Sequence, residues 1–130
     1  MSKTTAVIIA IIIVIIGFIA ALKFGLIPRK EYGPYDDFII CLKSAGAKMY
    51  GDYANSESLM QMSLFKESLG LFEKSGIYTE CNEYGPNPKT RKCQDASIMT
   101  YPTWIINKER YKGIQGLNKL SELTGCRYEN

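Results

Sequence analysis

The sequence predicts a mixed α/β domain that follows a single membrane-spanning helix. An unbroken apolar run occupies residues 6–22. After it, amphipathic helical segments alternate with short segments rich in β-branched and aromatic residues. The roughly 100 residues that follow the run are enough for one domain with one hydrophobic core.

The apolar run, AVIIAIIIVIIGFIAAL, lies between Lys3 and Lys23. A helix needs about 20 apolar residues, within a range of about 17–25, to cross a bilayer. The alternative is a cleaved secretory signal, whose apolar region should hold about 7–15 residues and end at a small-x-small site. Residues 23–28 offer no such site. We therefore predict an uncleaved anchor over residues 1–27 and a linker with Gly, Pro and charges over 28–35.

Two signals disagree about the side of the membrane on which the domain lies. Lys23, Arg29 and Lys30 follow the apolar run, whereas only Lys3 and the amino terminus precede it, which favours a cytoplasmic domain. The cysteines favour an oxidising compartment. Because a domain is translocated largely regardless of a few flanking charges, we predict a single-pass membrane protein with its C-terminal domain extracytoplasmic, at the cell surface.

The first half of the domain should hold two helices with a strand between them. Asp36 or Asp37 can cap a helix over residues 36–44, and Gly46 can end it. A short strand, 47–53, precedes a helix over 56–74, whose apolar stripe includes Leu59.

The second half should hold a strand, a short helix, a hairpin and a final helix. The expected elements are strand 77–81, a Gly- and Pro-rich loop 82–90, one or two helical turns in 93–99, strands 103–107 and 109–114, and helix 117–124. The resulting order, α-β-α-β-α-β-β-α, is that of a thioredoxin-like fold over residues 36–130. Such a fold has a central mixed sheet flanked by helices, and here one extra helix stands at its N-terminus.

Composition excludes several kinds of chemistry. The chain contains no histidine, which removes imidazole general bases, Ser-His and Cys-His nucleophile systems and most catalytic zinc sites. The net charge of +3 with mixed signs points to no nucleic-acid partner. We expect neither a metal nor a cofactor.

Four segments carry a resemblance to a known family: DFIICLKSAGAKMYG, AKMYGDY, YPTWIIN and YKGIQGLNKLSELTGC. Together they resemble the thioredoxin-like domains fused to, or partnered with, bacterial and archaeal vitamin K epoxide reductase homologues, over most of residues 36–126. In that family a Tyr-Trp-Cys-x-x-Cys segment follows the MYG strand. Here Tyr53 is kept, Ala54 replaces the tryptophan, and Asn55 and Ser58 replace the cysteines. Dithiol chemistry is therefore not available at this position. This absence favours a function other than catalysis.

The two replacing residues suit a helix start. Asn is among the best N-cap residues, worth about 1 kcal/mol over Ala. Asn55 can therefore begin the helix while removing the nucleophile, although Ser56 can take the same role.

The resemblance also implies that the Tyr101–Pro102 peptide bond is cis and lies beside the former dithiol. The alternative is that Pro102 merely shapes the start of a strand. Tyr53 and Tyr101, with Trp104 behind them, are candidates for an aromatic peptide-binding patch, against the alternative of plain packing.

The four cysteines allow three pairings, and their spacing without histidine does not suit a metal. The resemblance implies the disulfides Cys41–Cys126 and Cys81–Cys93. Two structural disulfides indicate an oxidising compartment, with the cytoplasm of hyperthermophiles as the exception. We expect Cys81–Cys93 to be a staple and not a redox pair, because it should lie far from the Tyr53 and Pro102 surface.

Three functions remain in view. The leading one is a membrane-anchored, redox-inactive thioredoxin-like protein that binds or scaffolds protein partners or assembles with itself. The second is a subunit of a helix-cored, pilin-like filament or membrane assembly. The third is a thiol–disulfide oxidoreductase partner of a quinone-linked membrane oxidase, which requires one of the four cysteines to turn over.

Overall fold

The computed structural model describes residues 2–23 and 32–128 of the chain. The chain forms two compact units, Met1–Glu31 and Tyr32–Asn130, which are described separately. The end of the predicted anchor (24–27) and the first part of the predicted linker (28–31) lie outside the described residues. The same holds for the flanking charges Arg29 and Lys30.

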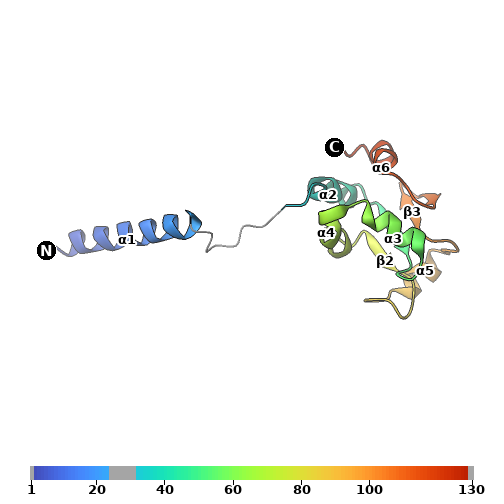
Figure 1. The fold of residues 1–130 in the computed structure, drawn as a ribbon, viewed down its shortest axis with the longest axis horizontal. Coiled ribbons are helices and arrows are strands. Elements are labelled where there is room, and N and C mark those ends of the chain that lie inside the picture. Colours follow the sequence, from blue (N-terminus) through green and yellow to red (C-terminus); the bar gives the residue numbers. More distant parts are fainter. Residues whose placement is uncertain (1, 24–31, 129–130) are drawn as a thin grey trace. The chain divides into compact units, whose positions relative to one another are not determined.

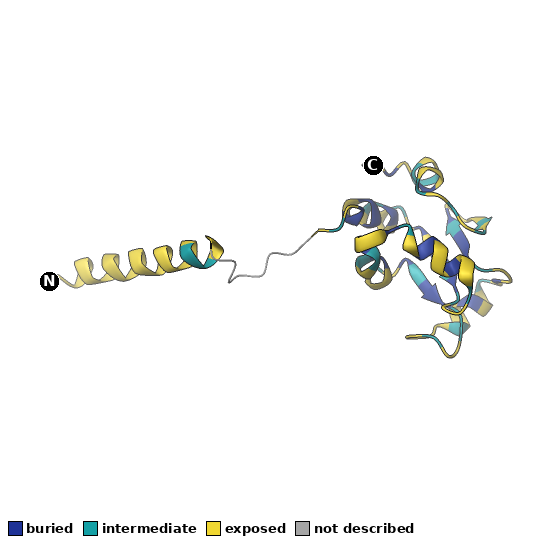
Figure 2. Ribbon diagram, viewed as in Figure 1, coloured by how far each residue is buried: buried dark blue, intermediate teal, exposed yellow. Residues whose placement is uncertain are grey.

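The first unit contains one helix, α1 (Lys3–Lys23), which is exposed along almost its full length (Figure 2). It is long and apolar enough to cross a membrane, a test that a signal sequence near the N-terminus also passes. α1 is therefore a possible membrane span.

The second unit is built on a four-stranded mixed sheet with the order β2-β1-β3-β4 (Figure 1). The strands are β1 (Lys48–Gly51), β2 (Tyr78–Glu80), β3 (Thr103–Ile106) and β4 (Glu109–Lys112). β1 runs parallel to β2 and antiparallel to β3, and β3 runs antiparallel to β4. Gly51 pairs with Glu80, and Tyr50 pairs with Thr103. This register brings the segments after β1, after β2 and before β3 to one edge of the sheet.

Five helices and a 3-10 turn complete the second unit. They are α2 (Asp36–Ser44), α3 (Ser56–Ser63), η1 (Lys66–Ser68), α4 (Leu69–Lys74), α5 (Thr90–Asp95) and α6 (Leu117–Thr124). α2 and α3 each pack against α4 (Figure 1). The predicted mixed α/β class and the order of its elements are confirmed.

Three local predictions are wrong. The helix expected over 56–74 is divided into α3, η1 and α4, because Lys66 adopts a φ of 47° and the side chain of Ser68 turns inward to accept a hydrogen bond from the Tyr35 backbone N–H at 2.9 Å. The helix expected over 93–99 occupies 90–95 instead, and Ser97, with a φ of 49°, lies beyond its end. Leu59, expected in the apolar stripe, is 52% exposed.

The N-cap of α2 also differs from expectation. Tyr35 occupies the cap position and no side chain caps the helix. Asp36 is buried within the first turn, where a carboxylate still interacts favourably with the positive end of the helix.

The core packs α2, α3 and α4 against the sheet through large aromatic side chains. Phe65 stacks on Phe72 with ring centroids 4.2 Å apart, and Phe72 lies 6.0 Å from Trp104. Gln61 is fully buried beside them. Its Oε1 accepts hydrogen bonds from Trp104 Nε1 at 3.1 Å and from the Gln115 backbone N–H at 2.6 Å. Trp104 is thus a core residue.

Candidate functional site

The segments that meet at one edge of the sheet carry five of the residues singled out by the sequence: Tyr53, Asn55, Cys81, Tyr101 and Pro102. Asp52–Asn55 follow β1, Cys81–Gly85 follow β2, and Tyr101–Pro102 precede β3. The Cys81 backbone N–H donates to the Gly51 carbonyl at 2.9 Å. Asn82 Nδ2 donates to Asp52 Oδ1 at 3.0 Å. The first two segments are therefore fastened to each other.

Asn55 and Ser58 are both hydrogen-bonded to backbone at the start of α3. Asn55 is the N-cap residue, and its Oδ1 accepts a hydrogen bond from the Ser58 N–H at 2.8 Å. Ser58 is fully buried, and its Oγ accepts from the Asp52 N–H at 3.2 Å. The N-cap residue of α3 is therefore Asn55 and not Ser56. A buried hydroxyl in a chain without histidine has no imidazole to activate it as a nucleophile.

A buried carboxylate, which sequence reasoning missed, organises the same edge. Glu80 is only 3% exposed. Its Oε2 accepts from the Tyr78 hydroxyl at 2.6 Å. Its Oε1 accepts from the backbone N–H groups of Asn82 at 2.8 Å and of Tyr53 at 3.3 Å. The sequence signal was an acidic residue inside a short strand otherwise suited to burial.

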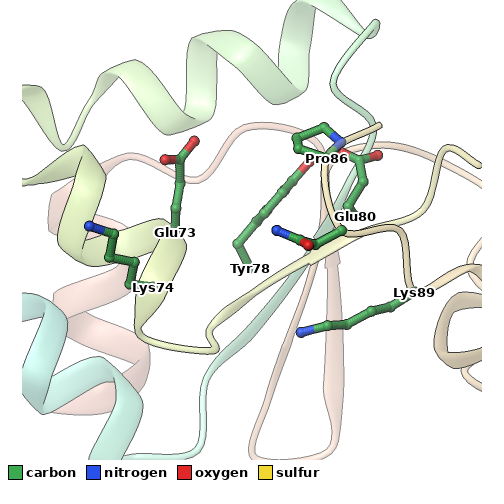
Figure 3. A pocket seen from close by; sticks show the side chains of 7 residues that line it. Glu73, Lys74, Tyr78, Glu80, Pro86 and Lys89 are labelled. Carbon is green, nitrogen blue, oxygen red and sulfur yellow. Dashed lines mark hydrogen bonds between the residues drawn. The ribbon is translucent and has the colours of Figure 1, made fainter. Parts of the chain in front are cut away.

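Gly51 makes room for the tyrosine that reaches this carboxylate. A Cβ atom at Gly51 would lie 2.8 Å from Cε2 of Tyr78. Figure 3 shows the Tyr78 side chain extending from β2 towards Glu80 and Pro86, in an open pocket of about 540 Å³ that is also lined by Glu73 and Lys89.

Two tyrosines of this region, Tyr78 and Tyr101, have a raised pKa. Burial raises the pKa of Tyr78, and the hydrogen bond to Glu80 and the charge of that carboxylate raise it further. Burial also raises the pKa of Tyr101, with added repulsion from Asp52 and Glu80. Tyr78 therefore acts as a hydrogen-bond donor that holds Glu80 in place.

Three tyrosines form a surface around this edge, here called the tyrosine surface: Tyr53, Tyr84 and Tyr101. Tyr53 is 41% exposed and Tyr84 is 80% exposed, while Tyr101 is partly exposed. A Cβ atom at Gly85 would lie 2.9 Å from the Tyr53 ring, so that ring packs on the backbone next to Tyr84. Tyr84 and Tyr101 line one pocket. Tyr53 and Tyr101 were predicted from the sequence, whereas Tyr84 was not.

Pro102 is buried, whereas the preceding Tyr101 is partly exposed. The Tyr101–Pro102 peptide bond is cis. Pro102 itself is fully buried, so its part is to position Tyr101 and the start of β3.

The four cysteines are paired in the structure as Cys41–Cys126 and Cys81–Cys93. The expected distance between the second pair and the Tyr53 and Pro102 surface is wrong. Cys81 and Cys93 line the same pocket, of about 580 Å³, as Tyr84 and Tyr101. The parallel pairing of β1 and β2 explains this, because it places Cys81 directly beside the segment that follows Gly51.

No group of three His, Cys, Asp or Glu side chains that could hold a metal ion occurs within residues 2–23 and 32–128. What the edge of the sheet offers is aromatic surface, one buried carboxylate and a disulfide.

The chain is similar in sequence to a known plant protein. No protein-family model matches the chain. Over 87 residues the chain is 39% identical to the thiol-disulfide oxidoreductase LTO1 of Arabidopsis thaliana, a match that covers 65% of this chain and 22% of that protein. The match indicates a thiol–disulfide oxidoreductase-like domain. The chain spans about a fifth of the length of this relative. A partnership with vitamin K epoxide reductase homologues stays a prediction.

Proposed function

We propose that the chain is a membrane-anchored, extracytoplasmic thioredoxin-like protein that binds extended polypeptides at the tyrosine surface, without dithiol chemistry at residues 55 and 58. One observation carries this proposal. The edge of the sheet keeps exposed aromatic side chains around Tyr101, while Asn55 and Ser58 are engaged in backbone hydrogen bonds.

Aromatic side chains at a strand end suit the binding of a chain segment. Tyr supplies a large apolar area and a polar hydroxyl at small entropic cost. The backbone before β3 is a place where an extended peptide can add strand-like hydrogen bonds, with its side chains in the neighbouring pockets. Such binding selects an extended backbone and apolar side chains more than one sequence.

The anchor and the disulfides support the proposed location. α1 has the length and composition of a membrane span. All four cysteines are in disulfides, and disulfides persist in oxidising compartments. Protease added to intact cells that express the chain should therefore digest the domain without lysis. Digestion that occurs only after lysis would place the domain in the cytoplasm and contradict this part of the proposal.

A thiol-free unfolded protein tests the binding itself. Reduced and carboxymethylated α-lactalbumin, labelled with a fluorophore, should bind the full chain in detergent micelles with saturable anisotropy. Tyr53→Ala and Tyr101→Ala should each weaken binding by at least about fivefold, as expected for aromatic residues central to an interface. Ile40→Ala, which alters an exposed apolar residue of α2, is the matched control and should bind like the parent. Equal binding by all four proteins would refute the tyrosine surface.

A further inference from the structure

The Cys81–Cys93 disulfide has the surroundings of a reactive bond. Cys81 is partly exposed, whereas Cys93 is only 4% exposed. Both line the open pocket that also contains Tyr84 and Tyr101. Of the two residues, Cys81 is therefore the more accessible to an incoming thiolate.

Three basic residues lie close to Cys93 in the sequence, and the acidic Glu83 lines the same pocket. Lys89, Arg91 and Lys92 lie within four positions of Cys93, and all three are exposed. Asp95 is the acidic residue of the same helix. Nearby Lys and Arg favour a thiolate over a thiol, and a more stable thiolate leaves faster in disulfide exchange. The pair is thus asymmetric, with Cys81 placed for attack and Cys93 placed to leave.

The second disulfide has different surroundings. Cys126 is 1% exposed and belongs to the hydrophobic core, and Cys41, which is partly exposed like Cys81, packs against that core. No pocket described for residues 32–128 is lined by either sulfur.

We propose that Cys81–Cys93 is an exchangeable disulfide that oxidises a pair of thiols in a polypeptide held on the tyrosine surface. This goes beyond the proposed binding function and rests on it in one respect, because the tyrosine surface brings the substrate cysteine to the pocket. Cys81 follows β2, whereas residues 55 and 58 follow the neighbouring strand β1.

The exchange has two steps. A substrate thiolate attacks Cys81 Sγ, a mixed disulfide forms, and the Cys81–Cys93 bond breaks with Cys93 leaving as a thiolate. A second substrate thiolate then attacks the substrate sulfur of the mixed disulfide, and Cys81 leaves as a thiolate. The substrate loses two electrons to the pair and gains a disulfide, and its two protons pass to solvent or to the released thiolates. A low-molecular-mass disulfide, such as oxidised glutathione, regenerates the pair by the reverse exchange.

Activity of full-chain variants in detergent micelles tests the exchange. The probe is reduced ribonuclease A in a buffer with oxidised glutathione, and the readout is the rate of disulfide formation in the probe. The parent should accelerate oxidation, Cys81→Ser with Cys93→Ser should abolish the acceleration, and Cys41→Ser with Cys126→Ser should retain it. No acceleration by the parent, or equal acceleration after loss of Cys81 and Cys93, would overturn the proposal.

A second measurement needs no variant. Dithiothreitol is added to the parent and each pair is followed by alkylation and peptide mapping. Cys81–Cys93 should be reduced at least about tenfold faster than Cys41–Cys126, because its two cysteines line an open pocket whereas Cys126 belongs to the core. Equal rates, or faster reduction of Cys41–Cys126, would contradict the asymmetry.

Tyr101→Ala separates the exchange from the proposed function. This variant should slow oxidation of ribonuclease A but leave reduction of Cys81–Cys93 by dithiothreitol unchanged. If oxidation of ribonuclease A is not slowed, the tyrosine surface does not hold the substrate, and the proposed function fails while the exchange stands.

Discussion

The domain has two disulfide-linked regions, and we assign a different role to the disulfide of each. The Cys41–Cys126 region joins α2 to the residues that follow α6 and is continuous with the aromatic core. The Cys81–Cys93 region closes the loop between β2 and α5 and lines a pocket beside Tyr101. The first bond adjoins the core, and the second adjoins the pocket that Tyr84 and Tyr101 also line. We infer from this difference that the surroundings of a disulfide, and not its presence alone, decide whether it serves stability or exchange.

The largest expected effect is on the Cys41–Cys126 region. Replacing both cysteines with serine frees a loop with a sequence separation of 85 residues. Chain entropy alone predicts a loss of about 4.5 kcal/mol in the free energy of unfolding. Urea unfolding, followed by the fluorescence of the single and buried Trp104, measures it. A loss no larger than that for Cys81–Cys93 would remove the distinction between the two regions.

The same replacement in the Cys81–Cys93 region should cost less. This bond closes a sequence separation of 12 residues, for which chain entropy predicts about 3 kcal/mol. Because the loop lies at the edge of the sheet, we expect the Trp104 emission of the folded state to stay that of the parent. A red shift of that emission before unfolding would show that this bond also supports the core.

Tyr78→Phe tests the buried carboxylate that holds the second region together. The change removes the hydrogen bond to Glu80, and a hydrogen bond to a charged group is worth about 2 kcal/mol.

The same variant should alter the alkaline limb of the stability curve. Burial and Glu80 raise the folded pKa of Tyr78 above its unfolded value of about 10. The stabilising contribution of the neutral phenol is complete below about pH 10 and is lost as the pH rises towards the folded value. The free energy of unfolding, measured at several alkaline pH values, should decline less steeply with pH in the variant than in the parent. Part of the decline that remains in the variant is due to Tyr101. Parallel declines would contradict the role assigned to Tyr78.

The smallest expected effect belongs to the helix cap. Asn55→Ala removes the acceptor of the Ser58 N–H and should lower the free energy of unfolding by about 1 kcal/mol. Ser56→Ala changes an exposed residue next to it and serves as the control with almost no effect. If Ser56→Ala costs as much as Asn55→Ala, the cap is assigned to the wrong residue.

The elements of the domain could be predicted from local sequence, whereas the contacts between them could not. Gly and Pro mark the limits of β1 and β3, and Asn55 has the chemistry of a cap, so these features follow from short segments. The break in the helix at Lys66 depends on a hydrogen bond that the Ser68 side chain accepts from the backbone N–H of the distant Tyr35. The burial of Glu80 depends on its register with Gly51.

The position of Cys81–Cys93 was mispredicted for the same reason. Its distance from Tyr101 is decided by the parallel pairing of β1 with β2 and by the path of the loop that follows. Neither can be derived from spacing along the chain, because a short loop can fold back over the edge of a sheet or away from it.

The most direct test of the account restores sulfur at the two positions that lack it. Asn55 and Ser58 are the N-cap residue and a residue of the first turn of α3, with the Asn55 side chain 2.8 Å from the Ser58 N–H. Side chains three apart at a helix start are neighbours, within the reach that a disulfide requires. Peptide mapping of the Asn55→Cys, Ser58→Cys full chain, oxidised in air, gives the result. The account predicts a disulfide between positions 55 and 58 with both native pairs intact. Two free thiols at these positions would contradict the prediction that they match the dithiol positions of the family that the chain resembles.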